Sequence, residues 1–292
     1  RSDTQTGPPG TTCWVSVLSC LLLACLYVGS LYVWRSSLPR NHPSVIKRRC
    51  VSVLLVSALS PAVVKTWMHW VDVSVLELMG VRMEGFVPAS ILPLLLTMVS
   101  PYLNLGFIFP DVQTWRLCVR DAVWLRNQVV APVTEELVFR GAMLPMLVPC
   151  TGPTAAIFVA PLFFGVAHFH HIIEQRRLGK DSMSVILLVA GQLAYTHFLR
   201  ARLIKSVICV SKGHVVGPVL CHSFCNSQGL PDVTSALQHP ERPALLFSYL
   251  MGILLFLVLL FPLTDPFFYG AAPVCSLAPP PASKERSVCV CS

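Results

Sequence analysis

Long runs of apolar residues constrain this chain more than any other feature of its sequence. The clearest are residues 13–34 and 244–263. Each can cross a bilayer, since a helix needs about 20 apolar residues to span the hydrocarbon core. Charged residues make up only 12% of the chain, whereas soluble domains are about one quarter charged. With 54% hydrophobic residues and a mean hydropathy of +0.66, the chain is predicted to be a polytopic membrane protein.

Other apolar segments are shorter or interrupted. They are residues 51–64, which stop at Lys65, residues 86–109, broken by Pro93 and Pro101, residues 128–148, 154–169 and 184–199, and a stretch ending near Asn226. Every span is expected to be helical, because lipid offers no hydrogen-bond partners to an open backbone. We therefore predict an all-α fold, a polytopic transmembrane helical bundle of about seven or eight helices with an intramembrane polar site.

The chain is predicted to form one membrane-embedded domain, residues 13–270, between two disordered ends. These ends are residues 1–12 and the tail 271–292, which is rich in Pro and Ser. The first apolar run is too long for the core of a signal peptide and lacks a clean small-residue cleavage site. We therefore interpret it as a retained membrane anchor.

Basic residues gather in short segments beside the apolar runs, and the chain has 22 Lys and Arg against 14 Asp and Glu. The clusters are Arg35, Arg40, Lys47, Arg48 and Arg49, then Arg176, Arg177 and Lys180, then Arg200, Arg202 and Lys205. The positive-inside rule predicts that such segments are cytosolic. A nucleic-acid-binding face would more often alternate aromatic and basic side chains on a soluble module. Nucleic acid is therefore not an expected partner, and the lipid bilayer is.

The 12 cysteines are expected to be unpaired thiols. Cys13, Cys20 and Cys25 lie in the first apolar run, where a free Cys behaves as a small apolar residue. Cys221 and Cys225 have a spacing that zinc could use, but no second pair of Cys or His completes four ligands.

Two adjacent glutamates and an arginine interrupt the apolar stretch "VVAPVTEELVFRGAMLP". Each ionisable side chain near the middle of a bilayer costs about 3 kcal/mol to insert. Glu136 and Arg140 are four residues apart on a helix, share a face and can pair. Glu135 lies about 100° away and is left over. A structural ion pair with a carboxylate beside a polar cavity would account for this motif alone equally well.

Two further motifs place polar side chains in apolar segments. In "PLFFGVAHFHH" Phe164 and His168 share one helical face, and in "GPVLCHSFCN" so do His222 and Asn226. The second pair can aim two N–H donors at one oxygen, as in an oxyanion hole. Each motif alone is more typical of an interfacial or interhelical hydrogen bond. Together with Glu135 they supply a base, a proton shuttle and an oxyanion clamp, the groups that add water to a carbonyl.

The three motifs also resemble, in order, those of a known family. "EELVFR", "FGVAH" and "HSFCN" are similar to the E-E-x-x-x-[AR], F-x-x-x-H and H-x-x-x-N series of the type II CaaX prenyl endopeptidases, within a wider family of intramembrane glutamyl proteases. The resemblance runs from about residue 13 to residue 269. The three motifs in this order are a strong signal, whereas any one of them is weak.

The resemblance implies a hydrolase that removes the last three residues of farnesylated or geranylgeranylated CaaX proteins such as Ras-type GTPases. It implies the endoplasmic reticulum membrane, with a site open to the cytosol. Glu135 and His168 would activate the attacking water, while His222 and Asn226 would stabilise the oxyanion. Three side chains would support them: Glu136, Arg140 and Phe164. A carboxylate–imidazole water activator needs no metal or other cofactor.

Two other classes of protein are weighed against this interpretation. A zinc-dependent membrane metalloprotease could use the same acids and histidines, but no His is followed by Glu, so the H-E-x-x-H helix is absent from the sequence. A transporter or scaffold could bury Glu–Arg pairs along a pathway. No pair of interrupted helices recurs in the sequence to favour a transporter.

Overall fold

The computed structural model places the parts of the chain that form the predicted helical bundle. It describes residues 13–34, 36–69, 71–99, 116–152, 155–156, 159–160, 162–163, 213–228, 240–263 and 265–270. Every regular element in these ranges is a helix, and the predicted all-α class is confirmed. The predicted span 184–199, most of 154–169 and both terminal segments lie outside the described residues, so the domain boundaries stay predictions.

The described elements follow one another from end to end of the chain. They are α1 (Cys13–Ser30), α2 (Pro43–Trp67), α3 (Val75–Leu78), α4 (Phe86–Val99), α6 (Ala122–Leu125), η3 (Arg126–Val130), α7 (Ala131–Glu136), η4 (Leu137–Ala142), α10 (Val216–Gln228), α12 (Arg242–Leu263) and η5 (Pro266–Phe268). Residues 143–152 are also helical and continue directly from η4.

Three of these helices are long and apolar enough to cross a membrane: α1, α2 and α12. The predicted spans at residues 13–34 and 244–263 correspond to α1 and α12 and are confirmed. Among the described side chains of the 242–259 window of α12, none is buried inside the protein. Its large apolar side chains, including Leu250, Leu254 and Val258, are exposed as expected for a lipid-facing helix.

The prediction for α2 was wrong in length. Residues 51–64 were expected to form a short span that stops at Lys65, whereas α2 is 25 residues long. The helix begins at Pro43, whose fixed φ suits a first helical position, and the His42 ring accepts a hydrogen bond from the Ser44 N–H at 3.3 Å. Its basic residues lie near the two ends, where long side chains can reach water beyond the hydrocarbon.

The predicted apolar stretch 86–109 is helical over its described part. α4 covers Phe86–Val99 and continues through Pro93, where the sequence predicted an interruption. Residues 100–109 lie outside the described ranges.

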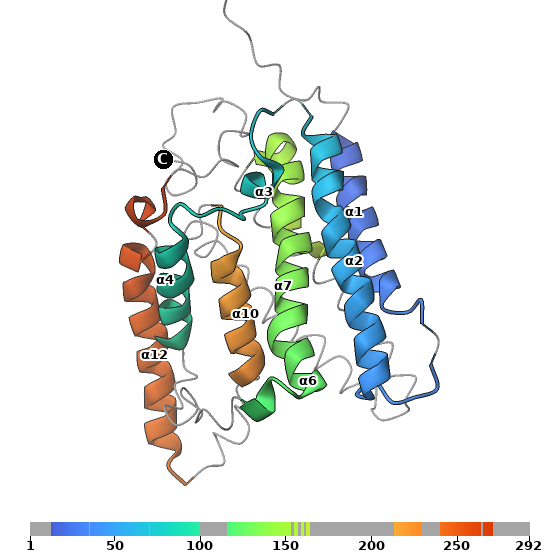
Figure 1. Ribbon diagram of the computed structural model, residues 1–292. Helices are drawn as coiled ribbons and strands as arrows, with labels where there is room; N and C mark the ends of the chain where they lie inside the picture. The colour runs from blue at the N-terminus through green and yellow to red at the C-terminus, as the bar shows by residue number, and fades with distance from the viewer. Residues whose placement is uncertain are drawn as a thin grey trace, which may run out of the picture.

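The long helices stand side by side in a row (Figure 1). From one edge to the other, the order is α12, α4, α10, α7, α2 and α1, with each helix contacting the next. Buried apolar side chains of α1, α2 and the helix around α7 form one core; examples are Leu23, Val53, Phe139, Met143 and Leu147. The polar residues of the "TEELVFR" motif therefore lie in the interior of the row.

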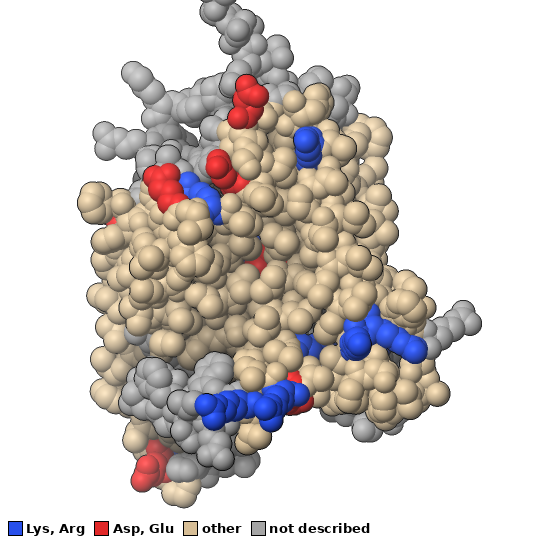
Figure 2. All heavy atoms as spheres, in the orientation of Figure 1, with Lys and Arg blue, Asp and Glu red and all other residues tan. Residues whose placement is uncertain are grey.

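Charged side chains gather at the two ends of the helices, which are the top and the bottom of the bundle in Figure 2. Lys and Arg are concentrated at the lower end. The described residues at this basic end are Arg40, Lys47, Arg48, Arg49, Arg116, Arg120, Arg126 and Arg242, with Asp121 and Glu241. Those at the opposite, acidic end are Asp72, Glu77, Glu84 and Asp265, with Lys65 and Arg82. At the basic end the described charges sum to +6, and at the acidic end to −2.

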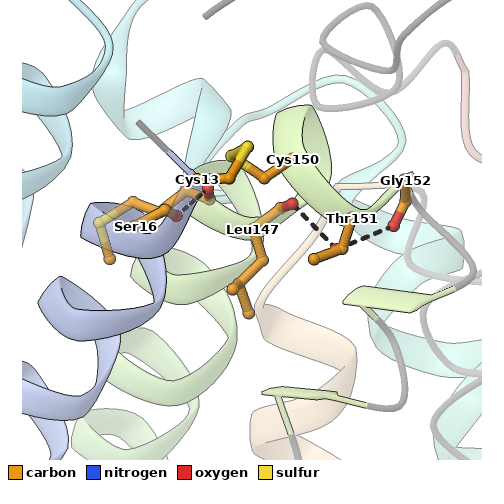
Figure 3. Close-up of a disulfide and its surroundings, with 7 residues drawn as sticks. Cys13, Ser16, Leu147, Cys150, Thr151 and Gly152 are labelled. Atoms are coloured by element: carbon orange, nitrogen blue, oxygen red, sulfur yellow. Dashed lines mark hydrogen bonds between the residues drawn. A yellow bond between two sulfur atoms is a disulfide. The ribbon is translucent and has the colours of Figure 1, made fainter. Parts of the chain in front are cut away.

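A disulfide joins Cys13, the first residue of α1, to Cys150 (Figure 3). The expectation that all cysteines are unpaired is therefore wrong for this pair. Their separation of 137 residues gave no local signal, and only the antiparallel packing of α1 on the helix that follows η4 brings them together. The described cysteines that remain free include Cys20, Cys50 and Cys221.

Candidate active site

One long helix carries the acidic motif, and it is not a regular α-helix. Between Ala122 and residue 152, two π-helical segments, η3 and η4, flank α7. An ideal α-helix would press the Pro132 ring against the carbonyl of Gln128, and the first π segment lies at that point. In the second, Gly141 allows a close approach, since a Cβ there would lie 3.0 Å from the Met79 carbonyl oxygen. Glu135 and Glu136 lie between the two wide turns.

Glu136 is the more deeply buried acid, with a side chain only 4% exposed. It forms an ion pair with Arg140, which confirms the pairing predicted from their spacing. Its Oε1 also lies 2.8 Å from Nδ1 of His222 on α10. The carboxylate thus binds a cation from its own helix and an imidazole from another.

Glu135 was expected to be left over, and that expectation was wrong. Its Oε2 lies 3.8 Å from Nε2 of His222, on the ring edge opposite Glu136. The Glu135 side chain is 18% exposed and that of His222 is 10% exposed. The imidazole therefore lies between the two carboxylates and faces Glu136 at hydrogen-bond distance and Glu135 from further away.

Two further polar contacts hold α10 against the start of the long helix. The Ser223 hydroxyl lies 3.0 Å from the Gln128 carboxamide in either orientation of that amide. The Asn226 amide donates to the backbone carbonyl of Asn127 at 2.9 Å. His222 and Asn226 are thus on one helix as predicted, but His222 meets the acids while this Asn226 bond is made to the backbone.

Close packing of α10 on α4 fixes the position of His222 from the other side. At Gly217 a Cβ would lie 2.6 Å from the Ala89 carbonyl oxygen, so only glycine allows this approach. One turn later, the Thr97 hydroxyl contacts the Cys221 sulfur at 3.1 Å. Small residues at such interfaces let membrane helices approach closely.

Phe164 and His168 lie outside the described residues, and their predicted roles stay predictions. Three polar side chains near the acids were not singled out from the sequence: Tyr27, Gln128 and Ser223. A polar residue inside an apolar segment was the signal available for each. Within the described ranges, no group of three His, Cys, Asp or Glu side chains is placed to hold a metal ion.

The fold and the site together define a helical membrane protein with a carboxylate–imidazole cluster between its helices. A family model described as "Type II CAAX prenyl endopeptidase Rce1-like" matches residues 121–228, which include both glutamates and His222. Human CAAX prenyl protease 2 is 52% identical over 300 residues, covering 96% of this chain and 91% of that protein. CAAX prenyl protease 2 of Caenorhabditis elegans is 31% identical, covering 82% of this chain and 96% of that protein.

The relative in Arabidopsis thaliana, also a CAAX prenyl protease 2, is 30% identical, covering 88% of this chain and 91% of that protein. The chain therefore belongs to the type II CAAX prenyl endopeptidase family and is a protease. No solved structure matches it significantly.

Proposed function

We propose that this protease removes the C-terminal tripeptide of prenylated CaaX proteins, farnesylated or geranylgeranylated and including Ras-type GTPases, in the endoplasmic reticulum membrane. The names of its relatives support the substrate class. The observation that carries the proposal is the cluster of Glu135, Glu136 and His222 inside an apolar helical bundle. Buried ionisable groups are costly in a membrane and mark functional sites.

Glu135 acts as the general base. The 3.8 Å between its Oε2 and Nε2 of His222 is too long for a direct hydrogen bond. A water molecule that donates to the Glu135 carboxylate and accepts from the His222 ring fits this spacing, which suits the attacking water. Glu135, with His168 as predicted from the sequence, takes a proton from the water as its oxygen attacks the scissile carbonyl. The same proton then passes to the leaving amine as the C–N bond breaks.

His222 stabilises the oxyanion, and Glu136 makes this role possible. To donate a hydrogen bond to the oxyanion, His222 needs a proton on Nε2. It needs another proton on Nδ1 to donate to Glu136, 2.8 Å away. The ring is then an imidazolium, which the Glu136 carboxylate stabilises. Arg140 in turn neutralises Glu136. Asn226 adds a second donor, because its amide has two hydrogens and one suffices for the Asn127 carbonyl.

The substrate reaches the site from the cytosol through the basic end. Along α10, exposure rises from the buried Gly217 to the exposed Asn226 and Ser227, which lie toward that end. The positive-inside rule places an end with a +6 charge in the cytosol, where prenylated proteins are made. The prenyl chain lies between helices, as apolar ligands do in helical bundles.

The test uses the full chain purified in detergent with a farnesylated peptide that ends in a CaaX tetrapeptide. Glu135→Gln keeps the shape of the side chain and removes the base. We expect turnover to fall by at least about 100-fold, the usual contribution of a general base. Thermal stability and elution volume should stay unchanged.

Glu77→Gln provides the matched control, because Glu77 is an exposed carboxylate at the acidic end. It should cleave at the wild-type rate. Wild-type turnover by Glu135→Gln would reject this assignment of the base. Retained activity after strong chelation would separate the proposed mechanism from that of a zinc protease.

A further inference from the structure

Helix α1 runs antiparallel along the helix that carries the acids and is attached to it at three points. Cys13 forms the disulfide with Cys150, and the Ser16 hydroxyl donates to the Met146 carbonyl. About three turns further on, the Tyr27 hydroxyl lies 2.8 Å from the Thr134 hydroxyl. The third contact reaches the residue directly before Glu135.

Tyr27 is held in one orientation by its surroundings. Its side chain is 4% exposed, and its ring packs edge-on against Phe139 with the centroids 5.4 Å apart. Because Tyr27 and Phe139 come from different helices, the ring fixes the distance between them. The phenol oxygen has a single position next to Thr134.

The direction of the hydrogen bonds follows from the number of protons available. Thr134 has one hydroxyl proton, and its oxygen lies 2.8 Å from the Val130 carbonyl oxygen, which can only accept. Thr134 therefore donates to Val130 and must accept from Tyr27. The result is a directed chain from Tyr27 through Thr134 to Val130.

This series of hydrogen bonds fixes the helical turn from which Glu135 projects. Val130 is the last residue of the first π segment, and Glu135 follows Thr134. Both hydroxyls are buried, so an apolar residue in place of Thr134 leaves the Tyr27 O–H without its acceptor, and loss of the Tyr27 hydroxyl removes the bond that ties Thr134 to α1. A tyrosine from α1 thus restrains the turn at the point where the wide helix returns to α geometry.

We infer that Tyr27 is a positioning residue for the catalytic acid, acting through Thr134 on the turn that presents Glu135. The inference rests on the proposed role of Glu135 as the base. Tyr27 acts through its contacts with Thr134 and Phe139. Its effect is to keep the carboxylate where it meets the water and His222.

The test is Tyr27→Phe, which keeps the ring and its contact with Phe139 and removes only the hydroxyl. We expect kcat to fall about tenfold with KM unchanged, because small displacements of a catalytic group have effects of this order or larger. Thr134→Val should lower kcat similarly, and the double variant should be no slower than the slower single variant. Thr134→Ser keeps the hydroxyl and should restore near-wild-type turnover.

Tyr269→Phe is the matched control. Tyr269 is also buried, and its hydroxyl donates to the Leu263 carbonyl at 2.6 Å near the acidic end. This variant should keep the wild-type kcat. A further arm combines Tyr27→Phe with Glu135→Gln. The double variant should have the same kcat as Glu135→Gln alone, whereas a general structural defect would lower the residual kcat further.

Wild-type kcat for Tyr27→Phe would overturn the inference, as would a rise in KM with unchanged kcat. If Glu135→Gln abolishes turnover while Tyr27→Phe does not affect it, only the role of Tyr27 fails. If Glu135→Gln itself cleaves normally, the proposed base is wrong. The two failures are therefore distinguishable.

Discussion

His222 joins two carboxylates that belong to a different helix. Glu136 holds one ring nitrogen at 2.8 Å, and Glu135 faces the other at 3.8 Å. With Arg140, these four side chains carry two negative charges and one permanent positive charge. A second proton on the imidazole gives it a positive charge and makes the group of four electrically neutral, the least costly state in an apolar interior. The proposed mechanism uses this imidazolium to stabilise the oxyanion.

A second histidine, His214, lies in the loop ahead of α10 and leads to a prediction about pH. Its Nε2 is 3.1 Å from Nε of Arg82 and 2.5 Å from the Glu84 carbonyl oxygen. Burial, followed by the nearby Arg82 guanidinium, lowers the pKa of His214 below its usual range. The unfolded chain therefore binds a proton here more readily than the folded protein does.

Stability from the neutral His214 is present above the ordinary histidine pKa of about 6.5 and is lost as the pH falls toward the lowered value. We expect the Tm in detergent to be lower at about pH 5 than at about pH 7.5. His214→Gln, which can still accept from Arg82, should show a smaller pH dependence. Equal pH dependence of the two proteins would contradict this assignment.

Contacts within one helix could be predicted from the sequence, and contacts between helices could not. The Glu136–Arg140 pair follows from a spacing of four residues. The approach of Glu136 to His222 spans 86 residues and depends on how α10 packs against α7. The sequence indicated that both groups serve one site, but not that the imidazole meets the acids directly.

At the scale of helices, hydropathy predicted α1 and α12 because uninterrupted apolar runs of that length have few alternatives. It failed for α2, whose first turns contain Lys47, Arg48 and Arg49. These residues cost little at the membrane surface, where long side chains extend toward water. Arg48 lies over the Trp34 ring at 5.9 Å from its centroid, an arrangement typical of a membrane interface.

The attachment of α1 by the Cys13–Cys150 disulfide predicts a loss of stability when it is broken. The bond closes a segment of 137 residues and restrains the unfolded chain. We expect Cys13→Ser to cost about 2–4 kcal/mol. Thermal unfolding in detergent should show a lower Tm, and a reductant should lower the wild-type Tm in the same way.

Cys25→Ser serves as the control, since Cys25 is a free, exposed cysteine on the same helix. Its Tm should match the wild type with or without reductant. If Cys13→Ser proves as stable as Cys25→Ser, the disulfide contributes nothing to the folded state.

The whole molecule has two chemically different ends, and two observations agree on how it lies in the membrane. The basic end carries +6 among the described residues, and the positive-inside rule predicts that such an end faces the cytosol. The disulfide belongs to the opposite end of α1, and disulfides persist in oxidising compartments such as the lumen of the endoplasmic reticulum. The charge and the disulfide thus favour the same orientation.

This orientation predicts which loops a protease can reach in sealed microsomes. A specific protease site inserted within residues 36–42, at the basic end, should be cut from outside without detergent. The same site within residues 71–74, at the acidic end, should be cut only after the membrane is opened. Residues 36–42 are exposed, and Asp72 and Ser74 are the exposed positions of the second loop, so each loop offers a surface position for the insertion. The reverse pattern would show that the acidic end faces the cytosol.

The two π segments set a limit on which changes in chain length this protein can accept. Each contains one residue more per turn than an α-helix would. Deleting one residue other than Arg140 between 137 and 142 would let this segment return to α geometry, which keeps the acids facing His222 and Cys150 facing Cys13. Adding a residue to the regular helix on either side has no such outlet and would rotate one half of the helix against the other by about 100°. Natural variants should therefore lose single residues within this segment more often than they gain residues beside it.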